Sequence, residues 1–171
     1  GEEFFIAHDV MMNKPIVLKN GEWAFPIAVW DWRLAENFPG FGMDNPDKGT
    51  FVYTTADKGK TFVKRGGTAF EDRSFDEHML IELKDGTLRM LVRCEKGFIG
   101  VADSKDGGFT WTDCFDCGYR GPTSRFHITR LKSGRILFIN HHDFNDRNNL
   151  TAIVGNIGIS EIVYNNINSA A

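Results

Sequence analysis

The hydrophobic positions of this chain come in short runs separated by glycine-rich turns, and the stretch from Ser74 to Trp111 shows the pattern most clearly. Two apolar runs there are joined by Lys84-Asp85-Gly86-Thr87. Asp-Gly between alternating hydrophobic residues is the strongest short-range signal of a β-hairpin, because glycine accepts the positive φ of a tight turn. A third run, Phe98 to Ala102, ends in a turn with the spacing Ser-x-Asp-x-Gly-x-Thr-Trp. The pattern predicts a meander of three or four short antiparallel strands, which is one blade of a β-propeller.

Both turns of this stretch recur in the chain. The closing turn occurs first around Asp57, with Thr in place of Ser and Phe in place of Trp, 49 residues before Asp106. The hairpin turn occurs three times, ending at Gly21, Gly86 and Gly134, and the last two copies lie 48 residues apart. Repeats of about 40 to 50 residues made of strands and turns are typical of propeller blades. No segment shows the apolar period of a helix, which excludes helical repeat folds.

Further strands are expected at 16–18 and 24–30, on either side of Asn20-Gly21, and at 51–54. Pro26 lies inside the second of these segments. Because proline has no N–H for the sheet ladder, we expect an edge strand or a bulge there. The stretch from Leu34 to Thr50 carries Pro, Gly, Asn and Asp without a period. It is expected to be a loop, of a length that usually borders a functional site.

The C-terminal stretch departs from the repeat. The spacing of the central blade predicts a third closing aspartate near position 154, where the sequence has only partial matches at Asn156, Gly158 and Ser160 and no tryptophan. We therefore expect the chain to stop part-way through a blade and to hold about three blades, at residues 8–65, 66–118 and 119–171. Closed propellers have about four to eight blades, so the remaining blades are expected to be missing from this chain.

Composition and charge narrow the possible partners and cofactors. The net charge is -3 and the pI is near 6.0, so nothing indicates a nucleic-acid partner. No apolar run reaches the roughly 18–20 residues that cross a membrane, so no membrane insertion is expected. Cys114 and Cys117, two of the three cysteines, have CxxC spacing, but no second pair completes a zinc site. Neither a metal nor another cofactor is expected.

The turn motif, its period and the strand pattern between residues 13 and 151 together resemble the sialidase superfamily, the six-bladed propellers marked by Asp-box turns, also called BNR repeats. The resemblance implies an all-β fold of four-stranded antiparallel blades. It also implies that the Asp-box residues lie on the outer side of the propeller, where they hold blades together and take no part in catalysis. Those residues are Asp57, Gly59, Asp106, Gly108 and Trp111.

The resemblance further implies a catalytic site. Sialidases place an acidic residue ahead of a strand that ends in Leu-x-Asp-Gly-x-Leu, and an arginine at the end of the paired strand; here these are Glu77 and Arg93. A further arginine before the next Asp-box matches Arg147. In this family a tyrosine is the nucleophile, and because a phenol is a weak nucleophile near neutral pH a carboxylate takes its proton, the role of Glu77. Arg93 and Arg147 would be two of three arginines that bind the substrate carboxylate, since a guanidinium can donate two parallel hydrogen bonds to it.

Several positions leave alternatives open. Arg125 precedes a strand and could face the propeller axis instead of, or beside, Arg147. His8, Asp9 and Asn13-Lys14 precede the first hairpin, at a rim where substrate contacts are expected. For each of these residues the alternative is a solvated surface side chain. The third arginine, an aspartate general acid and the tyrosine are expected outside residues 1–171.

The first interpretation is a portion of an exo-glycoside hydrolase that removes a terminal acidic sugar, such as sialic acid, from a glycan with retention of configuration and without a metal, in a secreted or periplasmic setting. This portion is expected to be inactive alone. The alternative is a non-catalytic carbohydrate-binding propeller in which Trp23, Trp30 and Trp32 stack on glycans. A protein-interaction scaffold and a lyase built on the same propeller remain open.

Overall fold

The computed structural model describes residues 1, 3–7, 9–29, 48–70, 72, 77–142 and 146–155. These residues form eleven β-strands and no helix, and therefore no helix that could cross a membrane. The strands are β1 (Ile16–Val17), β2 (Trp23–Val29), β3 (Gly49–Thr55), β4 (Val63–Thr68), β5 (Met79–Glu82), β6 (Leu88–Arg93), β7 (Phe98–Ser104), β8 (Phe115–Arg120), β9 (His127–Arg130), β10 (Ile136–His141) and β11 (Leu150–Gly155). The predicted all-β fold class is confirmed.

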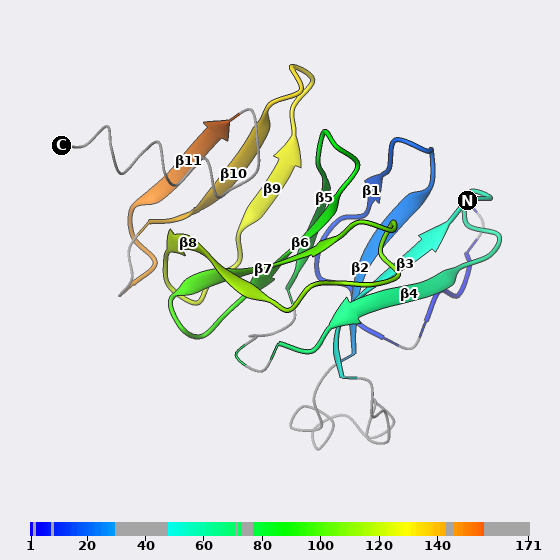
Figure 1. Cartoon of the computed structure of the whole chain (residues 1–171), viewed down its shortest axis with the longest axis horizontal. Helices are drawn as coiled ribbons and strands as arrows, with labels where there is room; N and C mark the ends of the chain where they lie inside the picture. The colour runs from blue at the N-terminus through cyan, green and yellow to red at the C-terminus, as the bar shows by residue number, and fades with distance from the viewer. Residues whose placement is uncertain are drawn as a thin grey trace.

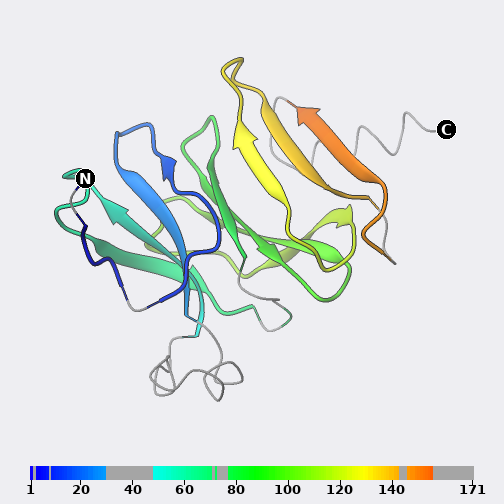
Figure 2. The same ribbon diagram turned by 180° about the vertical axis from the view of Figure 1, so that it is seen from behind.

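The strands form three antiparallel sheets in which consecutive strands are neighbours. The first sheet has the order β1-β2-β3-β4, the second β5-β6-β7-β8, and the third, within the described residues, β9-β10-β11. The sheets fan out side by side with the second sheet between the other two (Figures 1 and 2). Each sheet is a meander, as the repeated turns of the sequence predict.

The core lies in two layers, one on each face of the second sheet. Met90 and Val92 of β6 pack toward the first sheet, whereas Leu91 packs toward the third sheet with Tyr119 and Phe138. Successive side chains of a strand point to opposite faces. The continuous apolar run of β6 therefore reflects a strand that is covered on both sides.

The three hairpin tips lie along the same edge of the molecule, at the top of both ribbon views (Figures 1 and 2). Their glycines, Gly21, Gly86 and Gly134, have φ angles of 87°, 89° and 82°, a region that disfavours any residue with a Cβ. Each glycine N–H donates to the carbonyl of the leucine three residues earlier. The strands β1, β5 and β9, each the first strand of its sheet, are called the inner strands below. The segments that lead into them consequently meet at the opposite edge.

The prediction that Pro26 marks an edge strand or a bulge is wrong. Pro26 lies in β2, an internal strand, and pairs with Val52 in an unbroken register with β3. On the other side of β2, β1 pairs only as far as Ala24, and Val10 then bridges Ala28. Residues two apart in a strand direct their backbone groups to the same side, so the proline nitrogen falls in the gap between these two pairings. Of the predicted loop from Leu34 to Thr50, residues 34–47 lie outside the described part of the chain, and β3 begins at Gly49.

Two turns with the Asp-box spacing follow β3 and β7 and share one hydrogen-bond pattern. Asp57 accepts from the Thr55 hydroxyl at 2.8 Å, from the Thr61 hydroxyl at 2.7 Å and from the backbone N–H groups of Lys60 and Thr61. Asp106 accepts from the equivalent groups of Ser104, Thr110 and Phe109. These donors lower the pKa of Asp57 to about 2 and also lower the pKa of Asp106.

The second of these turns binds the first sheet. The backbone N–H of Gly66 in β4 donates to the Gly108 carbonyl at 2.8 Å, and Arg65 Nη1 donates to the Gly107 carbonyl at 2.5 Å. A Cβ at Gly66 would lie 2.2 Å from the Phe109 carbonyl oxygen, so only glycine permits this approach. The turn therefore connects the first and second sheets at their outer strands.

Candidate functional site

Glu77 and Arg93 form a buried ion pair at the edge opposite the hairpin tips. Glu77 comes two residues before β5 and Arg93 is the last residue of β6, and the antiparallel register of these strands brings the two positions together. Arg93 Nη1 lies 2.5 Å from Glu77 Oε2, and the side chains are only 7% and 8% exposed. Arg93 Nη2 also donates to the Thr123 carbonyl at 3.0 Å, which satisfies a second part of the guanidinium. Removal of either partner would leave a charge with little access to water.

Arg125, in the segment before β9, faces the same carboxylate from the open side. Its Nε lies 3.8 Å from Glu77 Oε1, and its side chain is 53% exposed. Its Nη2 donates to the Met12 carbonyl and to Asn13 Oδ1, the latter at 3.1 Å. Each oxygen of Glu77 therefore faces a different guanidinium, one buried and one accessible to a ligand.

Asn13, in the segment before β1, completes the group. Its Nδ2 donates to the carbonyl oxygens of Glu77 and His78, both at 2.9 Å. Behind it, the His78 ring is buried and its Nε2 lies 2.9 Å from the Phe51 carbonyl of the first sheet. The site is thus built from the lead-in segments of all three inner strands.

Two hydroxyl groups fix the segment before β9 that lies next to Arg93. Thr123 donates its hydroxyl to the Cys94 carbonyl at 2.8 Å, which fixes the carbonyl that Arg93 uses. The next residue, Ser124, donates to Asn140 Oδ1 at 2.9 Å in a buried position. These contacts tie the segment before β9 to both the second and the third sheet.

Within the described residues, the structure brings neither Arg147 nor Asp9 into contact with Glu77. Arg147 lies in the connection between β10 and β11; its backbone N–H donates to Asp146, and within the described residues its exposed side chain makes no hydrogen bond or ion pair. Asp9 accepts from the Tyr53 hydroxyl at 2.7 Å, and no contact among the described residues joins it to Glu77, Arg93 or Arg125. His8, Trp30 and Trp32 lie outside the described residues, and Trp23 packs beside the apolar cluster of the first sheet. The roles of these residues in substrate binding stay predictions.

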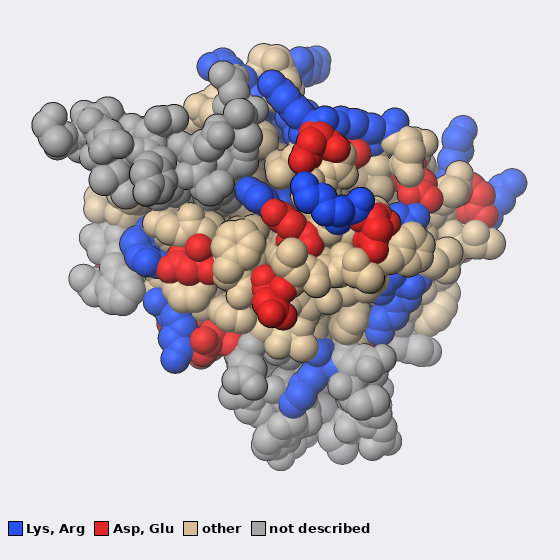
Figure 3. Space-filling model, viewed as in Figure 1, with Lys and Arg blue, Asp and Glu red and all other residues tan. Residues whose placement is uncertain are grey.

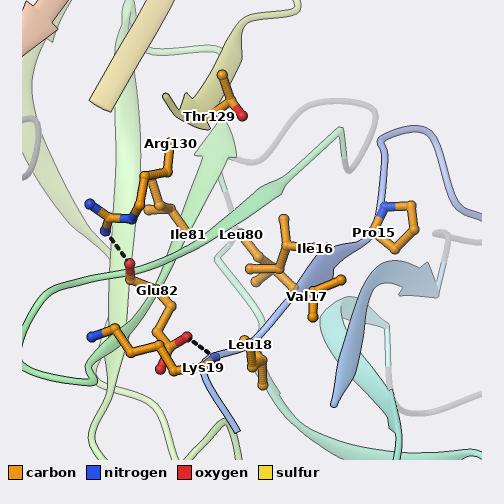
Figure 4. A pocket seen from close by; sticks show the side chains of 10 residues that line it. All are labelled: Pro15, Ile16, Val17, Leu18, Lys19, Leu80, Ile81, Glu82, Thr129 and Arg130. Atoms are coloured by element: carbon orange, nitrogen blue, oxygen red, sulfur yellow. Dashed lines mark hydrogen bonds between the residues drawn. The ribbon is translucent and has the colours of Figure 1, made fainter. Parts of the chain in front are cut away.

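A separate groove lies beside the inner strands (Figure 4). It has a volume of about 390 Å³ and is lined by residues of β1, β5 and β9 and of the turn after β1. Glu82 lines the groove and contacts two other lining residues, because the Glu82 carboxylate accepts from the Lys19 backbone N–H at 2.7 Å and the Glu82 carbonyl accepts from Arg130. Neither Glu77 nor the two arginines beside it line this groove, so it is distinct from the charged site.

Charged side chains of both signs alternate over the face shown in Figure 3, with Lys and Arg gathered along its upper edge, where the hairpin tips lie. The described residues contain no cluster of three or more His, Cys, Asp or Glu side chains that could hold a metal ion. Burial raises the pKa of the Cys114 and Cys117 thiols to about 12 and about 11, so near neutral pH they stay protonated and are weak nucleophiles.

Comparison with known proteins places this arrangement in a family. A family profile described as the BNR repeat-like domain matches residues 1–160. The chain belongs to the BNR repeat-like domain family. Among curated proteins, no match was found.

Solved structures show which fold this BNR repeat-like domain has. It is similar to a protein of unknown function from Dyadobacter fermentans (TM-score 0.65, 21% identity, covering 87% of this chain and 38% of that one). It is also similar to the NanB sialidase of Streptococcus pneumoniae (0.60, 18%, 82% and 20%) and to Trypanosoma rangeli sialidase (0.62, 18%, 82% and 23%). The fold is that of the sialidase propellers, and the predicted relation to the sialidase superfamily is confirmed. The chain spans between 20% and 38% of the length of these three proteins.

Sequence reasoning on this BNR repeat-like domain found Glu77, Arg93 and Arg125 but gave Asn13 no role beyond a place at the rim. A signal was present in the repeat itself. Asn13, Glu77 and Arg125 lie eight, nine and nine residues before the three hairpin glycines Gly21, Gly86 and Gly134. Alignment of the three hairpins on their glycines therefore indicates which polar residues meet at the opposite edge.

Proposed function

We propose that this chain forms part of the active site of an exo-glycoside hydrolase of the sialidase kind, which removes a terminal acidic sugar from a glycan with retention of configuration. The observation that carries the proposal is the Glu77–Arg93 pair, buried at the inner end of two neighbouring strands with a second, accessible guanidinium 3.8 Å from the same carboxylate. Fold alone does not decide function, whereas this grouping supplies two of the residue types that the reaction requires, a carboxylate and arginines.

The geometry supports a division of roles within the site. Arg93 engages Glu77 Oε2 and fixes the orientation of the carboxylate, which leaves Oε1 on the side that Arg125 and solvent share. Oε1 is therefore the atom placed to accept a proton from a nucleophilic hydroxyl, as retaining sialidases require of a carboxylate. Arg125 is placed to bind an anionic group of the sugar, because a guanidinium keeps its charge and can donate two hydrogen bonds to a carboxylate.

The test uses a fluorogenic sialoside. The protein tested comprises this chain together with whatever residues its gene encodes on either side of it. We expect Glu77→Gln, which keeps the side-chain shape, to lower kcat by roughly 100-fold or more, because a general base contributes about that much. The control is Arg120→Met, which removes an exposed arginine paired with Asp116 and should leave kcat unchanged. Full activity of the Glu77→Gln protein, or absence of turnover with any acidic glycoside, would contradict the proposal.

A second candidate function is carbohydrate binding without hydrolysis. It is favoured by the engagement of both Glu77 oxygens by guanidinium groups, which suits a carboxylate that holds arginines in place. Under this function the protein binds acidic sugars and releases none from the sialoside.

A further inference from the structure

We propose that the three hairpin tips and the groove beside them form a second binding site, which takes a negatively charged sugar chain. The site lies at the edge opposite Glu77, and binding there goes beyond the proposed hydrolysis and does not depend on it. We call it the hairpin-tip site. It consists of the groove and of five basic residues around it, which are Lys19, Lys84, Arg130, Lys132 and Arg135.

Each hairpin turn carries a lysine at the same place. The three turns read Leu-Lys-Asn-Gly, Leu-Lys-Asp-Gly and Leu-Lys-Ser-Gly, so Lys19, Lys84 and Lys132 occupy equivalent positions, and all three residues are exposed. Because the tips lie along one edge of the molecule, these lysines form a row there (Figure 1). Basic side chains gather along this edge in the space-filling view (Figure 3).

Two basic side chains connect neighbouring tips through backbone carbonyls. The Lys19 ammonium donates to the carbonyl oxygens of Leu83 and Lys84, both at 2.8 Å. The Arg130 guanidinium donates to the Glu82 carbonyl. Within the described residues, neither side chain pairs with a carboxylate. A carbonyl oxygen accepts a hydrogen bond but carries no net charge. Both cations are therefore held in place with their charge available to an anion.

The turns have an excess of positive charge, although the whole chain has a net charge of -3. Five basic and three acidic side chains lie in the turns, at residues 19–22, 82–87 and 130–135. Two of the acidic side chains are paired with basic residues from outside the turns, Glu22 with Arg65 and Asp85 with Lys105. A surface with such an excess attracts a polyanion, and salt weakens the attraction.

The groove indicates what kind of polyanion fits. Its volume of about 390 Å³ is in the range of small-molecule sites (Figure 4). Its lining combines aliphatic side chains of β1 with Thr129 and Glu82, and none of its described lining residues is aromatic. Hydroxyl and carboxylate groups can form hydrogen bonds with sugar hydroxyls. Single-stranded nucleic acids, in contrast, are bound largely by stacking of their bases on aromatic side chains. A sugar chain with carboxylate or sulfate groups matches both the groove and the cations around it.

The experiment measures, by fluorescence anisotropy, the affinities of a labelled heparin octasaccharide and of a labelled oligogalacturonate of the same length. The protein is the one used in the hydrolysis test. At low ionic strength, the double variant Lys84→Gln with Lys132→Gln should bind these probes roughly tenfold more weakly, since each exposed ion pair contributes up to about fivefold. Neither lysine side chain makes a hydrogen bond or ion pair within the described residues, so the fold should be retained. The matched control is Lys14→Gln with Lys96→Gln, two exposed lysines at the edge of Glu77, which should leave the affinity unchanged.

Two further variants separate the groove from the charges and this site from the hydrolytic one. Val17 lines the groove and is 69% exposed, so Val17→Trp should fill the groove and lower the affinity for the sugar probes by roughly fivefold or more. Glu77→Gln should bind them as the wild type does, whatever its effect on hydrolysis. The proposal is overturned if neither probe binds, if the two double variants lose affinity equally, or if a labelled oligothymidylate binds as tightly as the sugars.

Discussion

At the scale of single residues, the site depends on how two guanidinium groups share one carboxylate. The Glu77–Arg93 pair is buried. The Thr123 carbonyl accepts a hydrogen bond from Arg93, and the Asn13 amide donates one to the Glu77 carbonyl. A buried pair of this kind is costly to break, because the remaining partner keeps its charge in a place with little solvent. The exposed pairs on the surface of the chain carry no such penalty.

Replacement of Arg93 by Met should lower the free energy of unfolding by about 3 kcal/mol, since Glu77 is then left without its buried partner. The double variant Glu77→Gln with Arg93→Met should recover much of the loss. Arg120→Met is the control: Arg120 Nη1 lies 2.6 Å from Asp116, yet the pair is exposed and should contribute less than about 1 kcal/mol. Urea unfolding measures all three variants. Equal effects of the two arginine substitutions would show that burial does not set the strength of these pairs.

The residues of the site differ in how far the sequence could reveal them. Glu77 and Arg93 flank one hairpin, so their proximity follows from the register of two adjacent strands. Asn13 and Thr123 reach the same point from 64 and 30 residues away and act partly through backbone carbonyls. The spacing of the repeat places Asn13 at this edge of the molecule, but it does not record these contacts with backbone carbonyls. The position of Arg125 beside Glu77 likewise depends on the path of the chain before β9.

At the scale of strands and turns, local sequence signals were sufficient to predict the hairpins and the Asp-box turns. The hairpin glycines and the Asp-box spacing mark positions where a specific φ or a specific acceptor is required, and these demands do not depend on the rest of the fold. Pro26 shows the limit of such signals. An internal strand can accept proline where its neighbour on one side stops pairing, and the sequence of β2 alone does not show where β1 ends.

The Asp-box turns predict a dependence of stability on pH. In the folded state the pKa of Asp57 is about 2, below its usual value near 3.8, so its carboxylate stabilises the fold above about pH 4, and this contribution is lost as the pH falls toward 2. Asp106 has a lowered pKa for the same reason and acts with the same sign. The melting temperature of Asp57→Asn should therefore lie below that of the wild type at pH 6, and the difference should shrink between pH 4 and pH 2. A difference that stays constant over this range would contradict the assignment.

At the scale of the whole chain, the second sheet occupies the protected position. Both of its faces are covered by other sheets, and Met90, Leu91 and Val92 at its centre have no exposed surface. The third sheet is covered by the second on one face, and along β11 exposed and half-buried residues alternate. The repeat in the sequence predicted about three blades, and the described residues form three sheets, but a chain of similar repeats does not itself show which sheet is shielded.

Hydrogen exchange should follow this order. Amides of β6 should exchange roughly 100-fold or more slowly than amides of β11, because opening β6 requires separation of two packed layers. Mass spectrometry of peptides that span 88–93 and 150–155 measures the difference. Equal protection of the two strands would indicate that all three sheets open as one unit.

The first and second sheets are fastened to each other at two distant places, by Gly66 and Arg65 at their outer strands and by Asn13 at their inner ends. These two sets of contacts together fix the angle between the first and second sheets. A substitution at the outer rim that tilts one sheet would then alter the spacing between Asn13 and the carboxylate it supports. Under the proposed function, residues at the outer rim would therefore influence the site without any contact with a ligand.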